Sequence, residues 1–210
     1  IQERIDEHLQ VVGLLKNDSK FLTNLSEISN VITECFKSGG KLLICGNGGS
    51  AADSQHLATE LVSRFFLERK ALDAEALTVN TSTLTAVAND YSFDKVFSRQ
   101  LEAKGKEGDV LLAISTSGNS KNVIEAIKAA KSIGIKTIGF AGNNRDSLIC
   151  KMSDFDVSIP SNSTPRIQEA HILLGHIICE IVERYLFEKG GCLILPSKTE
   201  RNHQLATGRS

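Results

Sequence analysis

A hydroxyl-rich segment near the middle of the chain has the composition of a phosphate-binding turn. Residues 115–120 read Ser-Thr-Ser-Gly-Asn-Ser; they follow the apolar stretch 110–114 and precede a helical pattern that starts at Asn122. Such a turn presents backbone N–H groups and hydroxyls at the positive end of a helix, where a phosphate binds favourably. Serine clusters also occur as plain turn and cap chemistry, which stays an alternative here. The position at the carboxyl end of a strand favours the phosphate site.

A glycine-rich turn follows the first strand pattern. Residues 45–51 read Cys-Gly-Asn-Gly-Gly-Ser-Ala, and the glycines allow a tight turn and close approach of a ligand to the backbone. The spacing also fits a permissive form of the dinucleotide fingerprint, with Ala51 in the place of the last glycine. A dinucleotide site also needs an acid at the end of the second strand. That strand ends Val79-Asn80-Thr81, with Glu75 only at its start, so the sequence disfavours a nicotinamide cofactor.

His56 and Glu60 lie four residues apart in the helix predicted after this turn. This spacing puts both side chains on one helix face, where they can share a metal ion or a substrate proton. Imidazole and carboxylate are both zinc ligands. A solvent-facing pair is the alternative, but the position after a glycine-rich turn favours a site.

The last predicted helix carries a third polar group, which contains Gln168, His171 and His176. Histidines in an apolar helix often serve only as satisfied core residues. Gln168 and His176 are eight residues apart, about 80° around the helix and roughly 12 Å along its axis. Both could bind one ion at ~2 Å only if the helix bends or if subunits share the site.

Strand and helix patterns alternate after residue 40, which predicts an α/β fold with a parallel sheet covered on both faces. The first 37 residues are periodic and predict two helices or one long broken helix. Strands are expected at 41–45, 75–79, 110–114, 136–140 and 155–159, and helices near 50–67, 82–89, 94–104, 121–133, 145–151 and 165–187.

The chain has 210 residues and is expected to form one domain over residues 1–188, followed by a tail at 189–210 that is partly disordered and of open role. The formal net charge is −1 and no basic stripe is present, which argues against nucleic acid and a membrane surface as partners. Five cysteines form no C-x-x-C pair and mostly lie in apolar segments, as is typical of reduced core thiols. With no signal peptide or membrane span visible, we expect a cytoplasmic location.

In combination, these motifs resemble those of the phosphoheptose isomerases of the sugar-isomerase (SIS) superfamily over residues 1–188. The resemblance implies a five-stranded parallel sheet flanked by helices, a homotetramer with sites at subunit contacts, and a role in bacterial heptose synthesis for lipopolysaccharide or capsule. The motifs are Cys45-Gly-Asn-Gly-Gly-Ser50, His56-Leu-Ala-Thr-Glu60, Ala88-Asn-Asp90, Phe97-Ser-Arg-Gln100, Gly108 to Ser120, and Arg166-Ile-Gln-Glu169.

The resemblance also implies roles for individual residues. Glu60 matches the catalytic base and His176 the catalytic acid, while His171 matches no catalytic position. The zinc ligands, one ion per subunit, would be His56, Glu60, Gln168 and His176. The phosphate would be held by Ser115, Thr116, Ser117 and Ser120, and the rest of the sugar by Asn47, Gly48, Gly49, Asn89 and Asp90, with Ser50, Glu60 and Gln168 nearby.

The implied reaction converts sedoheptulose 7-phosphate to D-glycero-D-manno-heptose 7-phosphate through an enediol. Such an aldose–ketose isomerase needs a base, an acid and a group that tolerates oxyanion charge, which Glu60, His176 and zinc could supply. A carboxylate held by zinc is a weaker base, so we expect one oxygen of Glu60 to stay free. The main alternative is a non-catalytic SIS protein that binds a sugar phosphate or a replication initiator. An aminosugar-phosphate isomerase or deaminase is a further alternative, although such enzymes usually carry additional domains.

Overall fold

A five-stranded parallel sheet forms the centre of the molecule, as the sequence predicts. The structure is a computed structural model and describes residues 1–188. The strand order is β2-β1-β3-β4-β5, and every neighbouring pair is parallel. The strands are β1 (Leu42–Gly46), β2 (Ala74–Ala76), β3 (Val110–Ile114), β4 (Lys136–Ala141) and β5 (Phe155–Ser158).

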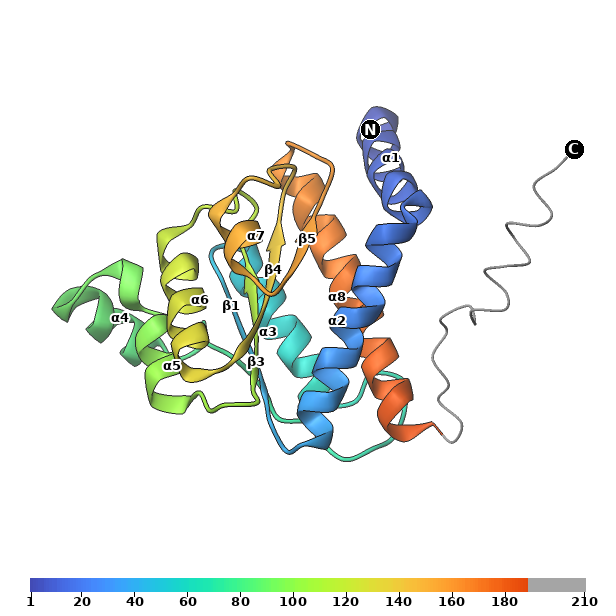
Figure 1. The fold of residues 1–210 in the computed structure, drawn as a ribbon. Helices are drawn as coiled ribbons and strands as arrows, with labels where there is room; N and C mark the ends of the chain where they lie inside the picture. Colours follow the sequence, from blue (N-terminus) through green and yellow to red (C-terminus); the bar gives the residue numbers. More distant parts are fainter. Residues whose placement is uncertain (189–210) are drawn as a thin grey trace, which may run out of the picture.

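Helices cover both faces of the sheet (Figure 1). One face carries α1 (Gln2–Asn17), α2 (Ser19–Lys37), α3 (Gly49–Val62) and α8 (Thr164–Phe187). The other carries α4 (Thr81–Asp90), the 3-10 helix η1 (Phe93–Lys95), α5 (Ser98–Lys104), α6 (Lys121–Ile133) and α7 (Leu148–Met152).

Successive residues of the strands enter two separate cores, because strand side chains alternate between the faces of a sheet. Leu42 and Ile44 of β1 pack with the α2, α3 and α8 side, whereas Leu43 and Cys45 pack with the α5 and α6 side. All five residues of β1 and all five of β3 are buried. Strands of this kind are typical of a parallel sheet covered on both faces.

The strand order reverses between β1 and β3, and this places the two predicted turns beside each other. The chain leaves β1 toward β2 on one side, and β3 pairs with β1 on the other side in the register Gly46↔Ile114. The glycine-rich turn and the hydroxyl-rich turn therefore begin at the same height of the carboxyl edge. This is the switch point at which open α/β sheets bind ligands.

Several predicted boundaries differ from those in the structure. The N-terminal segment forms two helices, because the Asp18 side chain caps α2 by accepting hydrogen bonds from the N–H groups of Lys20 and Phe21. β2 ends at Ala76 rather than at residue 79, since Asn80 caps α4 and turns the chain away from the sheet. The helix predicted at 94–104 is split into η1 and α5.

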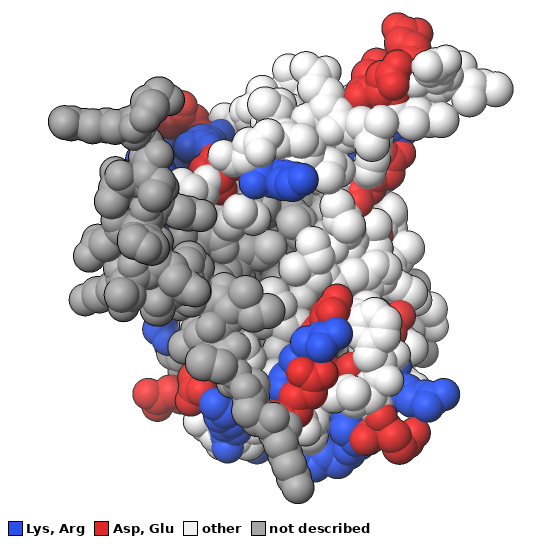
Figure 2. All heavy atoms as spheres, turned by 90° about the vertical axis from the view of Figure 1, so that its right-hand side faces the viewer, with Lys and Arg blue, Asp and Glu red and all other residues white. Residues whose placement is uncertain are grey.

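Charged side chains of both signs are interspersed on the face shown in Figure 2, in keeping with a net charge near zero. Within residues 1–188, no helix is both long and apolar enough to cross a membrane. Four cysteines in this part, Cys35, Cys45, Cys150 and Cys179, are buried free thiols. The predictions for the tail and for Cys192 lie outside the described residues.

Candidate active site

The hydroxyl-rich turn after β3 is a compact structure whose side chains face one another. Ser115 is buried, and its Oγ lies 2.9 Å from Ser120 Oγ and 3.3 Å from Ser117 Oγ. Gly118 has a φ of +66°, a conformation that a side chain would strain. Ser120 is the N-cap residue of α6, yet its hydroxyl makes no capping hydrogen bond. Three hydroxyls therefore converge at the positive end of a helix, an arrangement that suits a phosphate.

The glycine-rich turn after β1 is tied to the hydroxyl-rich side of the site by a pair of amides. Asn47 Nδ2 donates to Asn122 Oδ1 at 2.9 Å, and Asn122 Nδ2 donates to Asn47 Oδ1 at 2.8 Å. Gly48, with a φ of +55°, is the N-cap residue of α3. Asn122 lies in the first turn of α6, so the reciprocal bonds fix the starts of α3 and α6 relative to each other. The Asn47 side chain is engaged in this pair, and its predicted contact with the sugar stays a prediction.

A glycine lets α3 and α8 approach closely beside the acid–base residues. A Cβ on Gly175 would lie 2.5 Å from Leu57 Cδ2 and 2.6 Å from Leu57 Cδ1. Leu57 directly follows His56, and Gly175 directly precedes His176. The close helix packing therefore brings the two histidines together from segments 120 residues apart.

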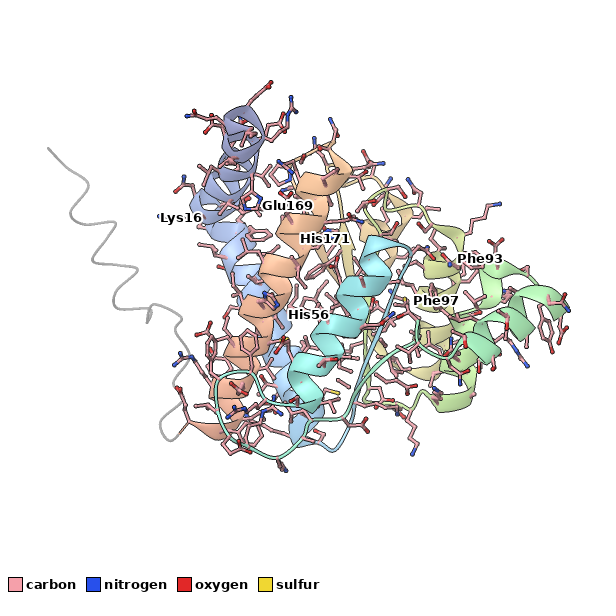
Figure 3. The ribbon with its side chains drawn as sticks, turned by 180° about the vertical axis from the view of Figure 1, so that it is seen from behind. Lys16, His56, Phe93, Phe97, Glu169 and His171 are labelled. Atoms are coloured by element: carbon pink, nitrogen blue, oxygen red, sulfur yellow. The ribbon has the colours of Figure 1, made fainter. Side chains whose placement is uncertain are left out.

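His56, Glu60 and His176 form one group where α3 contacts α8, and Figure 3 shows His56 between these helices. The two Nε2 atoms lie 2.8 Å apart, and His56 Nε2 lies 3.3 Å from Glu60 Oε1. One ligand atom from each of the three residues lies within 4.8 Å of the others. The His56 side chain is 49% exposed and that of Glu60 20%. The group is therefore accessible, and all its members come from a single chain.

The donor atoms of this group fit zinc. Zinc is commonly bound by imidazole nitrogens and carboxylate oxygens, and a catalytic site keeps a fourth position open. In a tetrahedral site two imidazole nitrogens at about 2.05 Å from the ion lie roughly 3.3 Å apart. The observed 2.8 Å between the two Nε2 atoms needs only a small opening to reach this value. His56, Glu60 and His176 could therefore hold the ion.

Gln168, the fourth predicted zinc ligand, contacts the first turn of α3. Its side-chain amide occupies the space where a Cβ on Gly49 would be placed. Gly49 precedes His56 by seven residues, about 10 Å along a helix. The structure thus places Gln168 beside the glycine-rich turn, where a sugar hydroxyl could reach its amide. Its role as a zinc ligand stays a prediction.

The predicted sugar-binding residues of α4 are exposed. Asn89 Nδ2 donates to Asp90 Oδ1 at 2.8 Å, and no residue of α4 is buried. Figure 1 shows α4 at the margin of the molecule, away from α3 and α8. Ser50, by contrast, is buried in the first turn of α3. Within one described chain, Asn89 and Asp90 are thus separated from the group around Glu60.

A buried ion pair anchors the segment that follows α3. Arg69 and Glu183 have side chains that are each 1% exposed, and Arg69 Nε donates to Glu183 Oε1 at 3.0 Å. The Arg69 guanidinium also donates to the carbonyls of Glu60, Leu61 and Ser63, at 2.9, 2.6 and 2.8 Å. These bonds satisfy carbonyl groups at the carboxyl end of α3. The helix therefore ends at Val62, whereas the sequence predicted an end at residue 67.

Glu183 also accepts hydrogen bonds from three consecutive backbone N–H groups, those of Phe65, Phe66 and Leu67, at 3.0, 2.7 and 3.1 Å. Burial alone would raise the pKa of Glu183, but these donors and Arg69 together hold it below its usual value. The Phe65 ring in turn packs on His176, with 5.7 Å between centroids. The ion pair therefore supports both Glu60 and His176.

Asp53 lies on α3 one turn before His56. Burial raises the pKa of its carboxyl group to about 6, although His56 acts in the opposite direction. Its Oδ2 is buried and has no hydrogen-bond partner among residues 1–188. Nothing in the spacing of the sequence distinguishes Asp53 from a solvent-facing residue.

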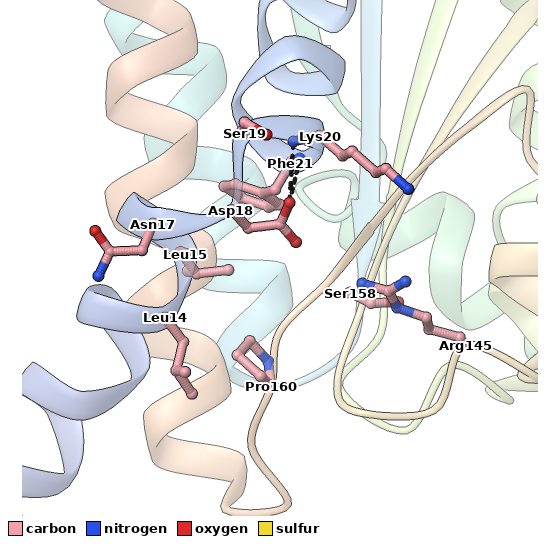
Figure 4. Close-up of a pocket in the computed structure, with 10 residues that line it drawn as sticks. All are labelled: Leu14, Leu15, Asn17, Asp18, Ser19, Lys20, Phe21, Arg145, Ser158 and Pro160. Atoms are coloured by element: carbon pink, nitrogen blue, oxygen red, sulfur yellow. Dashed lines mark hydrogen bonds between the residues drawn. The ribbon is translucent and has the colours of Figure 1, made fainter. Parts of the chain in front are cut away.

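A cavity of about 550 Å³ lies at the junction of α1 and α2, close to Arg145 and Pro160 (Figure 4). None of the predicted site residues lines it. The predicted site, which includes His56, Glu60 and His176, therefore lies apart from this cavity.

Comparison with known proteins shows the family of the chain. A family described as "SIS domain" matches residues 14–142. A phosphoheptose isomerase of Clostridium acetobutylicum is 52% identical over 189 residues, which cover 89% of this chain and 95% of the relative. The chain belongs to the phosphoheptose isomerase family.

Solved structures of this family have the same fold. The phosphoheptose isomerase GmhA of Neisseria gonorrhoeae has a TM-score of 0.77 and 42% identity, with 87% of this chain and 98% of that chain covered. A phosphoheptose isomerase of Francisella tularensis has a TM-score of 0.83 and 33% identity, with 87% and 96% covered. The likeness to the phosphoheptose isomerases thus extends over almost the whole of the described part.

Sequence reasoning missed several residues that shape the site of this phosphoheptose isomerase family member. Asn122 is an ordinary helix residue by pattern, and the only sign of Gly175 is a glycine inside a helix, which often marks close packing. Arg69 and Glu183 are 114 residues apart, and no local periodicity connects them. Phe65 was assigned to a continuous helix, which hid its contact with His176.

Proposed function

We propose that the protein isomerises sedoheptulose 7-phosphate to D-glycero-D-manno-heptose 7-phosphate through an enediol, as a step of bacterial heptose synthesis. The observation that carries the proposal is the convergence of Glu60 and His176 within reach of one small ligand. A base and an acid at such a distance are what an aldose–ketose isomerase needs. A non-catalytic sugar-phosphate-binding or replication-initiator-binding protein has no use for this pair and is not favoured.

Glu60 is the proposed carbon base. It takes the proton from C1 of the ketose, the electron pair of that bond forms the C1–C2 double bond, and His176 protonates the oxygen on C2. His176 then takes the proton from the oxygen on C1, and Glu60 returns its own proton to C2 to give the aldose. Positioned carboxylate and imidazole side chains are common general acids and bases in enzymes.

We propose His56, Glu60, Gln168 and His176 as the zinc ligands, with one ion per subunit. A bound zinc ion would polarise the carbonyl and stabilise the charge on the enediol oxygens. One oxygen of Glu60 must remain free for proton transfer. Metal analysis of protein purified without chelator tests this assignment; apoprotein that retains full activity in a chelator would contradict it.

The phosphate group is assigned to the hydroxyl-rich turn of Ser115, Thr116, Ser117 and Ser120. The converging hydroxyls and the uncapped start of α6 support this assignment. Binding energy from a group far from the reacting carbons can position the substrate for the chemical step. The same logic assigns contacts with the sugar chain to the glycine-rich turn and to Asn89 and Asp90.

We further propose a homotetramer whose sites lie at subunit contacts. Large apolar side chains are exposed on the two elements at the margins of the fold, namely Ile5 and Leu9 on α1 and Tyr91 and Phe93 around the end of α4. Clustered exposed apolar side chains are typical of protein interfaces. α4 of a neighbouring subunit could carry Asn89 and Asp90 to the group of His56, Glu60 and His176. The buried free thiols support a location in the reducing cytoplasm.

An NMR assay in deuterated water tests the proposed reaction directly. Purified protein is incubated with sedoheptulose 7-phosphate, and the appearance of the aldose and the exchange of the carbon-bound proton are followed. Aldose formation together with exchange supports the enediol mechanism. Tight binding of the substrate without turnover or exchange would instead favour the binding protein.

A further inference from the structure

His171 is a buried histidine of α8 that the proposed chemistry does not use (Figure 3). It is 1% exposed and lies between Gln168 and His176 along the helix. Whereas His176 meets α3, the His171 ring faces the sheet and packs on Phe140 of β4, with 5.4 Å between centroids. The helix that bears the proposed acid therefore also reaches the strand next to the hydroxyl-rich turn.

The polar contact of His171 is directed at the end of β4. Its Nε2 lies 3.2 Å from the carbonyl oxygen of Ala141. Burial lowers the pKa of His171 to about 4, so the ring is neutral at physiological pH and Nε2–H donates to this carbonyl. Nδ1 is buried and has no hydrogen-bond partner among residues 1–188. The buried imidazole thus has one hydrogen bond, at Nε2, and leaves its other polar atom, Nδ1, without a partner in the described part of the chain.

The residues on either side of Ala141 hold the hydroxyl-rich turn. The carbonyl of Phe140 accepts a hydrogen bond from Ser115 N–H at 2.9 Å, and Gly142 N–H donates to the carbonyl of Thr116 at 3.0 Å. A Cβ on Gly142 would lie 2.6 Å from that oxygen and 2.7 Å from Ile167 Cδ1 of α8. The turn, the end of β4 and α8 are therefore in close contact around Gly142, where even one added methyl group would clash.

We propose that His171 is a positioning residue that fixes the hydroxyl-rich turn relative to α8 through the end of β4. His171 and His176 are five residues apart, about 7.5 Å along one rigid helix. The same helix thus sets the place of the phosphate-binding hydroxyls and that of the imidazole acid. The inference rests on the proposed role of the turn in phosphate binding.

Steady-state kinetics of His171→Leu and His171→Gln test the proposal. Leucine fills the space without a donor, whereas the glutamine amide can again donate to Ala141. In His171→Leu the KM for sedoheptulose 7-phosphate and the inhibition constant of inorganic phosphate should both rise roughly fivefold, the factor expected for one hydrogen bond, with little change in kcat. His171→Gln should recover most of this loss.

A matched control separates positioning from stability. Thr33→Val removes another buried hydrogen bond, from Thr33 Oγ1 to the Ser29 carbonyl at 2.8 Å in α2, and should lower the melting temperature without changing KM. A His171→Leu protein with wild-type KM and wild-type phosphate inhibition would overturn the proposal, as would equal effects of leucine and glutamine.

Two further variants make the result unambiguous. If His171→Leu does not fold, Gly142→Ala displaces the end of β4 from Thr116 and should raise the same two constants; unchanged values would overturn the proposal. Ser117→Ala reports on the phosphate assignment itself. Normal phosphate inhibition in Ser117→Ala would mean that the assigned phosphate site is wrong, whereas a loss there with none in His171→Leu would reject only the role of His171.

Discussion

Replacing Glu183 by glutamine should destabilise the protein strongly although the side chain keeps its shape. Glu183 Oε2 accepts from the N–H groups of Phe66 and Leu67, and Oε1 accepts from Phe65 N–H and Arg69 Nε. Glutamine offers one oxygen and one NH2 group. Whichever way the amide turns, its NH2 meets two donors and leaves them without an acceptor.

The magnitude follows from the burial of the pair. Both side chains are 1% exposed, so Arg69 would remain charged and buried without its counterion. Breaking a buried ion pair on one side typically costs about 3–5 kcal/mol, and each buried unsatisfied donor about 1–3 kcal/mol, with overlap between the two. We therefore expect a loss of about 4 kcal/mol in the free energy of unfolding. This is a large part of the ~5–15 kcal/mol typical of a domain.

Urea unfolding followed by far-ultraviolet circular dichroism measures this loss, since the chain has no tryptophan for fluorescence. The measurement must be repeated at several protein concentrations, because association contributes to apparent stability. Arg69→Met and the double variant with Glu183→Gln complete a mutant cycle. The double variant should be less destabilised than the sum of the single variants, since it contains no uncompensated charge.

A second readout concerns the site. Arg69 holds the carbonyl of Glu60, and Glu183 holds the segment that presses Phe65 on His176. Folded Glu183→Gln protein should therefore show a lower kcat as well. A loss of stability below about 1 kcal/mol would refute the reasoning, because it would mean that the pair is solvated rather than buried.

Three further predictions concern individual residues. Glu60→Gln should keep substrate affinity, measured by calorimetry, and abolish turnover; near-normal activity would remove Glu60 as the base. Gly175→Ala should force α3 and α8 apart, because its Cβ would lie 2.5 Å from Leu57, and should lower kcat with a loss of stability of about 1–3 kcal/mol; a crystal structure with unchanged helix spacing would contradict this. The pKa of His171 is lowered to about 4 in the folded state, against about 6.5 when unfolded, so between these values the unfolded chain binds more protons. The free energy of unfolding should therefore fall as the pH falls from 6.5 toward 4, by up to ~1.4 kcal/mol per pH unit, and His171 should have no such effect above pH 6.5. In His171→Gln, the plot of unfolding free energy against pH should be flatter over this range.

The fold could be predicted well from the sequence because its signals are local. Apolar strands such as Val110–Ile114 are long enough to be recognised, and the central strand β3 has the predicted bounds. These local signals do not give the order of the strands in the sheet, which the tertiary structure shows. The predicted bounds of short elements were less accurate. β2 is only three residues long, and the chain soon enters α4, which the Asn80 side chain caps.

The composition of the two turns and the spacing of His56 and Glu60 were determined by the sequence alone, since a turn and a helix face depend on neighbouring residues. Tertiary structure decided which distant residues join them. Gly175 packs on Leu57 and brings His176 to His56, Asn122 pairs with Asn47, and Gln168 lies beside Gly49. These contacts depend on how α8 crosses α3 and on how closely two backbones can approach. Packing of the whole chain sets both, and no local pattern encodes them.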